Sequence, residues 1–522
     1  MKNGLVIDFH DSVPARLAAA DKLVFADRSY CYSLCWSRKG EKHSENKPEN
    51  LKLSTNILNK TRLSYLVSGK LGPVSFNHAL IHSQQDSYIE ERISITNTSE
   101  IAVQIEDIKF GFRKNLSENE AFRFIAVPFR VQIDGKVHDY SSKDLLDVKF
   151  ANSNEPMPWA EGIPHLSDNG KLRSEAWLMT FNEDDSMDSH KSALLIAKYN
   201  NQNIEMSVAE VERRNETANL IFGGAGFSLF REPYKATALA PKETFIFGVT
   251  RYEIYKGGIS DGYALYRKWL NSNGHKLPEN YNPPINWNEL YDVGWYHSNP
   301  EKLKQFYTRD ALMDEARKAK EIGWELLYLD PGWEVCEGTA LWDEARLGTP
   351  KDFVVEVKKR YGIDVGYRDT GYLYRDEFPH QWYWHGKDKD DRGQKWHIPN
   401  YEDVWRFCSC CKEYRDEKIR RLRKLTEQGF KFMMFDEYAW FGPCYAKDHG
   451  HSVPSTPEEH VLGMYKIIEK VRETSPDLLV EAHDLIWPCP GQCVICRFIT
   501  VRVLAQAQVI KRIGDLSSSG IV

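Results

Sequence analysis

The chain has 522 residues, of which 42% are hydrophobic and 28% are charged, and its net charge is -6 at neutral pH. This length exceeds what one hydrophobic core usually supports, so two or more domains are expected. The mildly acidic balance excludes the strong basic field that attracts nucleic acid or anionic membranes.

The first residues do not read as a secretory signal, and no segment is apolar enough to span a membrane. Asp8, His10 and Asp11 interrupt the apolar residues that follow Lys2, whereas a signal needs an apolar run of about 7–15 residues. No run approaches the ~20 apolar residues of a membrane span. These features predict a cytoplasmic protein without nucleic-acid or membrane partners, and they leave a homo-oligomer open.

Residues 1–275 carry the pattern of an antiparallel β-sandwich, because short alternating apolar and polar segments are separated by polar turns. Near the end of this region, the spacing of Tyr263, Tyr266 and Leu270 predicts a helix with these side chains on one face. Residues 276–284 are rich in Pro and Asn, as a linker should be. We therefore expect the domain boundary in this segment.

Residues 285–522 show strands that alternate with helices, which indicates βα units and a parallel sheet. The expected strands are residues 287–293, 325–329, 363–367, 430–435 and 478–481. The expected helices are residues 310–322, 352–361, 413–428 and 457–474. A TIM-type (β/α)8 barrel typically needs about 250 residues. Because the region also holds a long insertion at 371–412, we expect an incomplete (β/α)8 barrel.

The tail after Trp487 does not continue the alternation. One strand is expected at 498–504, and no strand–helix pair follows it. A barrel strand without a covering helix exposes apolar surface. We therefore expect a truncated chain whose tail packs poorly.

Four of the expected strands end in a carboxylate, at Asp330, Asp369, Asp436 and Asp484. The carboxyl ends of parallel barrel strands form one rim, which carries the active site of such barrels. We therefore expect these four carboxylates to converge, although an acid at a strand end can also cap the next segment. Further polar residues beside these ends are candidates for substrate binding: Glu437, Glu481 and His483.

The insertion at 371–412 and the cysteines raise two further questions. The insertion is rich in aromatic residues, which either form platforms for sugar rings or fill a small core of their own.

Six of the ten cysteines fall into two groups, namely Cys408, Cys410, Cys411, Cys489, Cys493 and Cys496. Only the pair 493 and 496 has the spacing of a zinc knuckle. We expect reduced, partly buried thiols and no cofactor, with a metal site as the alternative.

The motif LDPGW at the end of the second barrel strand, and the apolar run that ends in Asp436, resemble the retaining α-galactosidase (melibiase-like) glycoside hydrolases. The resemblance extends over about 90–484. It implies that Asp436 is the nucleophile and that Asp330 and Trp333 line the sugar subsite. It also places Trp295, in the motif DVGW, near the sugar.

Several positions depart from the family pattern. Met434 stands where the family has a sugar-binding lysine, and Pro331 replaces the second acid of the D-D-G-W motif. The family's general acid follows the sixth strand, where no matching motif occurs here. The remaining candidates for that acid are Asp484 and Glu481.

The sequence therefore predicts a glycoside hydrolase that acts on a carbohydrate substrate by a retaining double displacement, which requires two carboxyl groups about 5–5.5 Å apart. Two alternatives stay open. One is a metal-dependent barrel enzyme with Asp330, Asp369, Asp436 and His483 as ligands. The other is a carbohydrate-binding or truncated hydrolase-like protein without turnover.

Overall fold

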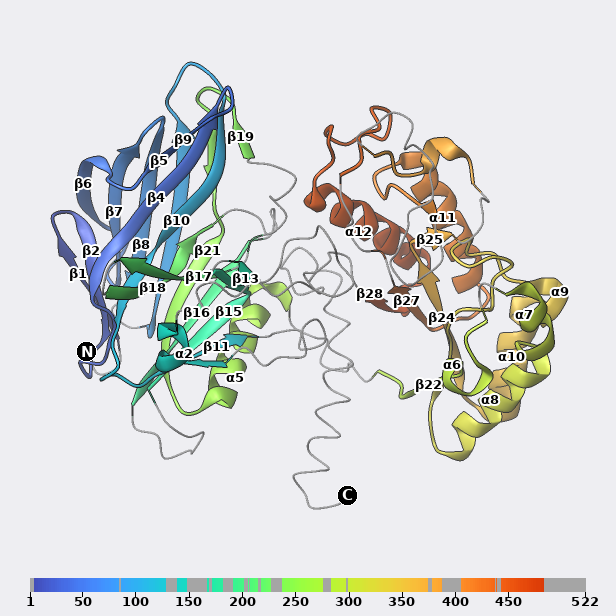
Figure 1. The fold of residues 1–522 in the computed structure, drawn as a ribbon. Coiled ribbons are helices and arrows are strands. Elements are labelled where there is room, and N and C mark those ends of the chain that lie inside the picture. Colours follow the sequence, from blue (N-terminus) through green and yellow to red (C-terminus); the bar gives the residue numbers. More distant parts are fainter. Residues whose placement is uncertain are drawn as a thin grey trace. The chain divides into compact units, whose positions relative to one another are not determined.

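The structure of the protein is a computed structural model. It describes residues 4–83, 86–127, 139–147, 167–168, 171–181, 191–200, 205, 207–214, 217–226, 237–275, 283–296, 299–373, 378–386, 405–436, 438 and 443–482. The described residues up to Gly274 form one compact unit, and those from His275 onward form another (Figure 1). Within these ranges, no helix combines the length and the apolar character that crossing a membrane requires.

Two large antiparallel sheets build the first unit (Figure 1). In spatial order, one sheet contains β13 (Ser167–Asp168), β14 (Lys171–Ser174), β17 (Ser207–Arg214), β18 (Thr217–Ala225), β10 (Val103–Leu116), β4 (Arg28–Arg38) and β5 (Glu41–Glu45), with β19 (Thr237–Leu239) beside β10. The other contains β12 (Asp139–Ser141), β11 (Arg123–Val127), β15 (Ala176–Thr180), β16 (Ser192–Tyr199), β21 (Val249–Lys256), β9 (Tyr88–Asn97), β8 (Val74–Ser83), β7 (Arg62–Leu71) and β6 (Glu49–Ile57), with β20 (Thr244–Ile246) beside β9. Smaller elements are β1 (Leu5–His10), β2 (Val13–Ala19), β3 (Val24–Ala26) and α2 (Ser142–Leu146).

Both large sheets contribute to one apolar core. Successive side chains of a strand point to opposite faces, so alternating sequences bury one face of each sheet. The ring of Phe110 on β10 packs against Phe76 on β8 at 5.5 Å, and Phe112 packs against Tyr252 on β21 at 5.1 Å. The expectation of an antiparallel sheet domain in the first half of the chain is therefore confirmed.

Helix α5 (Ile259–Leu270) covers the outer face of the second large sheet. Its buried side chains include Tyr266, Trp269 and Leu270, at the i, i+3 and i+4 spacing of one helix face. The expected helix is present, but the expected face is wrong at Tyr263, which is 43% exposed. The buried face instead includes Trp269, which lies three residues after Tyr266 and next to Leu270.

Five parallel strands form the sheet of the second unit. They follow one another in chain order: β22 (Asn286–Asn288), β23 (Leu326–Leu329), β24 (Asp364–Thr370), β27 (Phe432–Asp436) and β28 (Leu479–Ala482). The apolar runs predict these strands closely, except that 290–293 is helical rather than extended. In the part of the chain that the structure describes, these five strands do not complete an eight-stranded barrel.

Helices separate the parallel strands. They are α6 (Leu290–Val293), α7 (Pro300–Phe306), α8 (Arg309–Glu321), α9 (Glu344–Leu347), α10 (Pro350–Tyr361), α11 (Lys412–Thr426) and α12 (Pro457–Thr474), and the insertion adds η2 (His380–Trp382) and the pair β25 (Tyr372–Leu373) and β26 (Trp405–Arg406). Thr456 and Glu459 form a capping box at the start of α12. Side chains of α8 are buried at Leu312, Ala316 and Ala319, as their spacing predicts.

Candidate active site

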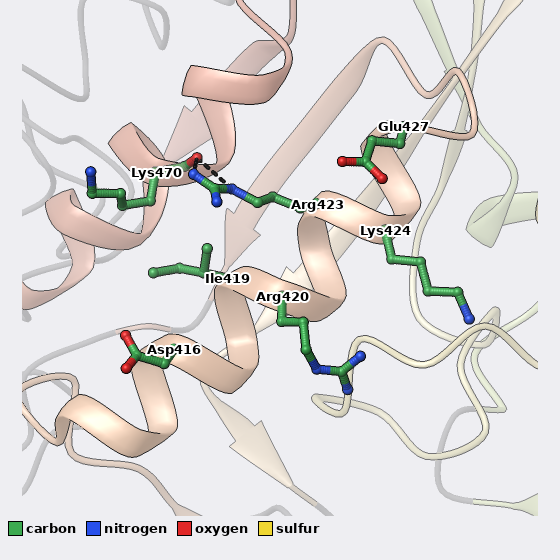
Figure 2. Close-up of a pocket in the computed structure, with 7 residues that line it drawn as sticks. All are labelled: Asp416, Ile419, Arg420, Arg423, Lys424, Glu427 and Lys470. Atoms are coloured by element: carbon green, nitrogen blue, oxygen red, sulfur yellow. Dashed lines mark hydrogen bonds between the residues drawn. The ribbon is translucent and has the colours of Figure 1, made fainter.

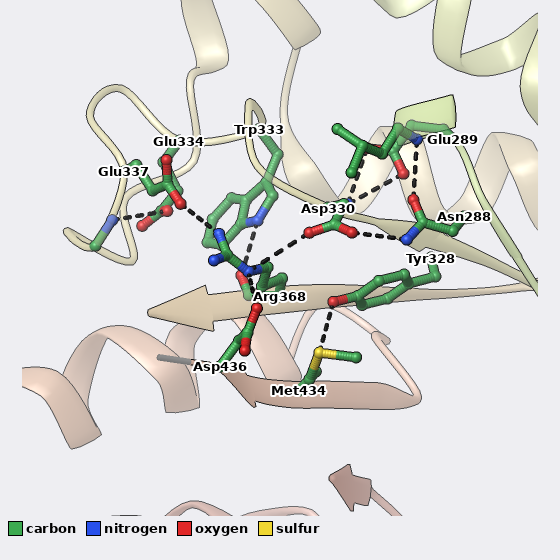
Figure 3. Close-up of polar contacts among 12 residues, drawn as sticks. Asn288, Glu289, Tyr328, Asp330, Trp333, Glu334, Glu337, Arg368, Met434 and Asp436 are labelled. Carbon is green, nitrogen blue, oxygen red and sulfur yellow. Dashed lines mark hydrogen bonds and ion pairs between the residues drawn. The ribbon is translucent and has the colours of Figure 1, made fainter. Parts of the chain in front are cut away.

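Arg368 on β24 lies at the centre of a group of carboxylates (Figure 3). Its Nε atom lies 2.8 Å from Oδ2 of Asp436 and 3.5 Å from Oδ1 of Asp330, and its Nη1 atom pairs with Glu337. The arginine side chain is only 5% exposed. One cation therefore faces three acids in a place that excludes most water, and the group has an excess of negative charge when all three acids are ionised.

The strand register explains why these side chains meet. Arg368 lies opposite Met434 of β27, and Met434 lies opposite Glu481 of β28. Register partners share a face of the sheet, as do residues two apart on one strand, so Asp436 lies on this face as well. The hydroxyl of Tyr328 on β23 contacts Sδ of Met434 at 2.9 Å on the same face. Asp436 and Glu481 are thus brought to one face, together with an arginine that the sequence analysis did not single out.

Asp330 follows directly after β23 and is largely buried. Its Oδ2 atom accepts a hydrogen bond of 2.6 Å from Nδ2 of Asn288. Burial raises the pKa of Asp330 to about 6, although the charge of Arg368 and the Asn288 hydrogen bond oppose this shift. The carboxyl group therefore titrates close to neutral pH, which is a property of functional carboxylates.

A second acid, Glu289, holds the backbone of Asp330 by hydrogen bonds. It is fully buried, accepts the backbone N–H of Asp330 at 2.8 Å and accepts the hydroxyl of Tyr307 at 2.7 Å. Burial, followed by the charge of Asp330, raises the pKa of Glu289 to about 8. The glutamate is thus protonated at neutral pH, which limits the negative charge that the site must tolerate.

The two tryptophans expected near a sugar lie in different surroundings. Trp333 is only 1% exposed, and its Nε1 atom donates to the backbone oxygen of Arg368 at 3.0 Å (Figure 3). Its ring also packs edge-on against Tyr367 at 5.2 Å. Trp333 therefore holds the backbone of β24, and its place in the sugar subsite stays a prediction. Trp295 is 55% exposed in the loop after α6 and stays a predicted sugar contact.

Asp369 does not join the carboxylates around Arg368. Its Oδ1 atom pairs with Nζ of Lys418 on α11 at 2.5 Å, and its Oδ2 atom accepts the hydroxyl of Tyr438 at 2.5 Å. Asp369 and Lys418 are both fully buried. The physical reason is the alternation of β24, which directs the neighbours Arg368 and Asp369 to opposite faces. Asp369 thus lies on the other face of β24 from Arg368, and its part in the site stays a prediction.

Three of the expected site residues lie outside the described residues, namely Glu437, His483 and Asp484. The cysteines at 489, 493 and 496, the strand expected at 498–504 and the tail after Trp487 also lie outside them. For the metal-dependent alternative, Asp369 pairs with Lys418 and Asp330 pairs with Arg368. The shared ligand set of that alternative stays a prediction.

The site contains polar residues that the sequence analysis missed, namely Asn288, Glu289, Glu337 and Arg368. One signal for the arginine was available. In the run IDVGYRDTGY, Arg368 stands directly before Asp369, so alternation allows only one of the two to face the same side as Asp436. Asn288 is the last residue of the short strand β22, Glu289 follows it, and Glu337 lies in a loop, where sequence spacing does not indicate direction.

A separate hollow of about 560 Å³ lies on the surface of α11 and α12 (Figure 2). Its lining is mostly charged and comprises Asp416, Ile419, Arg420, Arg423, Lys424, Glu427 and Lys470. Arg423 crosses between the two helices and donates to the backbone oxygen of Lys470 at 2.8 Å. None of the strand-end carboxylates lines this hollow, so it is distinct from the candidate site.

Comparisons with known proteins agree with the geometry at the level of fold. No protein-family model matches the chain, and no curated protein matches it in sequence. Among solved structures, the galactosidase domain of the α-galactosidase–sucrose kinase AgaSK has a TM-score of 0.53 at 13% identity, covering 91% of this chain and 63% of that one. The GH36 α-galactosidase AgaB from Geobacillus stearothermophilus has a TM-score of 0.55 at 11% identity, covering 96% of this chain and 72% of that one.

A variant of a second enzyme from that organism, the GH36 α-galactosidase AgaA, was solved in complex with stachyose. It has a TM-score of 0.51 at 12% identity, covering 89% of this chain and 62% of that one. The chain thus spans roughly two thirds of the length of these enzymes. The resemblance expected from the sequence is confirmed as a similarity of fold to GH36 α-galactosidases.

Proposed function

We propose that this protein is a retaining glycoside hydrolase of the α-galactosidase type and that Asp436 is its nucleophile. The observation that carries the proposal is the position of Asp436 at the carboxyl end of β27, 2.8 Å from Nε of Arg368 and on the face that also presents Glu481. In parallel βα folds, the carboxyl ends of the strands carry the reacting groups. The similar fold of GH36 α-galactosidases supports the same reaction class.

The proposed reaction has two steps. A carboxylate oxygen of Asp436 attacks the anomeric carbon, the glycosidic C–O bond breaks, and a protonated carboxyl group gives its proton to the departing oxygen. Water then attacks the glycosyl-enzyme ester, releases the sugar and returns a proton to the second carboxyl group. We assign the acid–base role to Asp484, with Glu481 as the alternative on the neighbouring strand.

Arg368 and Asp330 have supporting roles in this proposal. The guanidinium group of Arg368 pairs with Asp436 and orients one of its oxygens. Asp330 binds sugar hydroxyls, because a carboxylate accepts hydrogen bonds in a fixed direction. Met434 occupies the position of the family's sugar-binding lysine, and Arg368 on the adjacent strand supplies a cation next to it. We therefore propose that Arg368 replaces the missing lysine as the positive group of the sugar subsite.

The substrate class that fits this arrangement is an α-galactoside. One protein of similar fold was solved with stachyose, which shows a carbohydrate ligand for that protein. A second candidate function is carbohydrate binding without turnover. It is favoured by the ion pair between Arg368 and Asp436, because a carboxylate held by a buried arginine is a weaker nucleophile.

Hydrolysis of an aryl α-galactoside by the full chain tests the proposal. We expect Asp436→Asn to lower kcat/KM by at least ~10³-fold, because the amide cannot attack the anomeric carbon. The matched control is Asp364→Asn at the other end of β24, where the carboxylate makes a surface pair with Lys358. Equal turnover by wild type and Asp436→Asn would refute the role of Asp436. Binding of the galactoside without any turnover would instead establish the second candidate.

A further inference from the structure

Two cysteines and two histidines of the second unit come together away from the candidate active site. One ligand atom from each of Cys408, Cys444, His449 and His451 lies within 4.8 Å of each of the others. The two cysteines and His449 are buried, and His451 is partly buried. Cys408 follows β26, and the other three residues belong to the segment between β27 and α12.

The two imidazoles are oriented by hydrogen bonds outside the group. Nε2 of His449 lies 2.7 Å from the backbone oxygen of Gln381, so this nitrogen carries the proton and donates. Nδ1 of His449 is then the unprotonated nitrogen, and it lies 3.5 Å from Sγ of Cys444. A histidine that donates one ring N–H to a backbone carbonyl and presents the other nitrogen to a group of thiols has the arrangement of a metal ligand.

His451 repeats this arrangement with its nitrogens exchanged. Nδ1 lies 2.6 Å from the backbone oxygen of Ser452 and therefore donates to it. Its other ring nitrogen, Nε2, is buried, and the thiol of Cys444 is its neighbour. Because Nδ1 is bonded to a backbone carbonyl, Nε2 is the ring nitrogen that is available to a metal.

The donor set and its size fit zinc. Two thiolates and two neutral imidazoles form a common tetrahedral set for Zn²⁺, with bonds of about 2.3 Å to sulfur and about 2.0–2.1 Å to nitrogen. The edges of such a tetrahedron are about 3.3–3.8 Å long. The separations here reach at most 4.8 Å, so small rotations of the side chains would close the group around an ion.

The surroundings of Cys444 agree with a bound thiolate. The backbone N–H of His385 donates to Sγ of Cys444 at 3.4 Å, which stabilises negative charge on the sulfur. Of the other two cysteines of the sequence cluster, Cys411 points elsewhere, whereas Cys410 lies within hydrogen-bond range of the Cys408 thiol next to the group. The thiol of Cys410 contacts the backbone oxygen of Glu459 at 3.2 Å, and the thiol of Cys411 contacts Glu413 at 3.5 Å.

We propose that Cys408, Cys444, His449 and His451 bind one Zn²⁺ ion in a closed structural site. Four protein ligands leave no open position for water or substrate, so the ion would not take part in catalysis. The site would join the insertion at 381–385 and the end of β26 to the segment that follows Asp436. This assignment replaces the expectation that Cys408 is a simple buried thiol, and it could not follow from spacing because Cys444 is far from Cys408 in the sequence.

Metal analysis of the full chain tests the site. Chain purified from zinc-supplemented medium and freed of loose metal should contain one equivalent of zinc by mass spectrometry. Cys444→Ser and His449→Ala should each retain less than a tenth of that zinc, because loss of one ligand opens the site. His449→Cys preserves four ligands and should keep the metal, which separates loss of a ligand from loss of the fold. Replacement of zinc by Co²⁺ should give the visible absorption of tetrahedral cobalt with thiolate ligands.

Two control variants define the outcomes. Cys411→Ser removes a neighbouring thiol outside the group and should keep one equivalent of zinc. A double variant, Cys493→Ser with Cys496→Ser, removes the CxxC pair and should also keep it. The proposal is overturned if wild type holds no stoichiometric zinc, or if zinc is lost from the double variant and kept by Cys444→Ser.

Discussion

Two groups of buried carboxylates, one in each unit, are balanced differently. In the first unit, Glu91 on β9 is 1% exposed and accepts the hydroxyls of Tyr30 and Tyr252, each at 2.7 Å. Nε2 of His78 lies 2.7 Å from the same carboxylate, and its other nitrogen contacts Tyr32 at 2.6 Å. One acid thus has three polar partners, drawn from both large sheets.

The second unit shows the opposite balance, because several acids compete for one cation. Arg368 forms ion pairs with Asp330, Glu337 and Asp436. The pKa of Glu91 is lowered, since its hydrogen bonds to His78, Tyr30 and Tyr252 outweigh burial. The pKa of Asp330 is instead raised to about 6, because burial outweighs its partners.

This difference in partners distinguishes a carboxylate buried for structure from carboxylates buried for function. A fully satisfied carboxylate fixes the contact between two sheets and has no capacity left for a ligand. A group of acids crowded around one buried cation is costly for the fold, and natural proteins keep such groups mainly where chemistry needs them. The comparison therefore supports the Arg368 group as the active site and the Glu91 group as part of the core.

The largest expected effect comes from removing the shared cation. Arg368→Met should destabilise the protein by about 3–5 kcal/mol in urea unfolding at pH 7, because it leaves three acids without their positive partner. Arg360→Met is the matched control on α10, where the arginine is 59% exposed and pairs with Glu356. That change should cost at most about 1 kcal/mol. Equal stability of the two variants would contradict the assigned role of Arg368.

The next largest loss of stability is expected at Glu91, the buried carboxylate of the first unit. Glu91→Gln should cost roughly 2–3 kcal/mol at pH 7, because it weakens hydrogen bonds made to a charged group. The folded pKa of Glu91 is lowered from 4.5, so its contribution is present above that pH and is lost as the pH falls through the folded pKa. Urea unfolding at pH 7 and at pH 4 should therefore show a smaller difference between variant and wild type in acid. A difference that grows in acid would show that Glu91 is not ionised in the fold.

For Glu289→Gln, we expect the opposite dependence of the stability difference on pH. The folded pKa of Glu289 is raised from 4.5 to about 8, so its contribution to stability is fully present below pH 4.5 and is lost as the pH rises towards 8. Glutamine keeps an acceptor for the backbone of Asp330 and cannot ionise. The variant should be more stable than wild type by roughly 2 kcal/mol at pH 6, by more at pH 8, and nearly equal to it below pH 4.5. Thermal unfolding across this pH range measures the change, and a destabilised variant at pH 8 would contradict the raised pKa.

The smallest effect is expected at Trp333. Trp333→Phe removes the hydrogen bond to the backbone oxygen of Arg368 and should cost about 1–2 kcal/mol. Trp295→Phe, at an exposed ring, should stay within about 0.5 kcal/mol in the same unfolding assay. If both changes are neutral, Trp333 does not hold β24 in place.

Sequence reasoning located the strands of the second unit well, because their apolar runs are short and end at polar residues. It also located Asp330 and Asp436, since strand ends in a parallel sheet share one edge. It did not show that Asp369 lies on the opposite face of β24 from Arg368, because the rule for strand ends ignores which face a residue takes. It missed Arg368 for the same reason.

Other features depend on tertiary contacts that spacing cannot show. The burial of Trp333 results from its packing against Tyr367 and from its bond to the backbone of β24. The group of Cys408 with Cys444 and two histidines joins segments on either side of β27. Neither arrangement has a regular period in the sequence.

Covalent labelling tests the central assignment most directly. A fluorinated α-galactosyl reagent with a good leaving group needs no general acid, and it traps the ester formed with the nucleophile. Peptide mapping by mass spectrometry should find one sugar on Asp436, and free galactose should slow the labelling. A sugar on Asp330 or another carboxylate, or unchanged labelling of the Asp436→Asn variant, would contradict the assignment of Asp436 as the nucleophile.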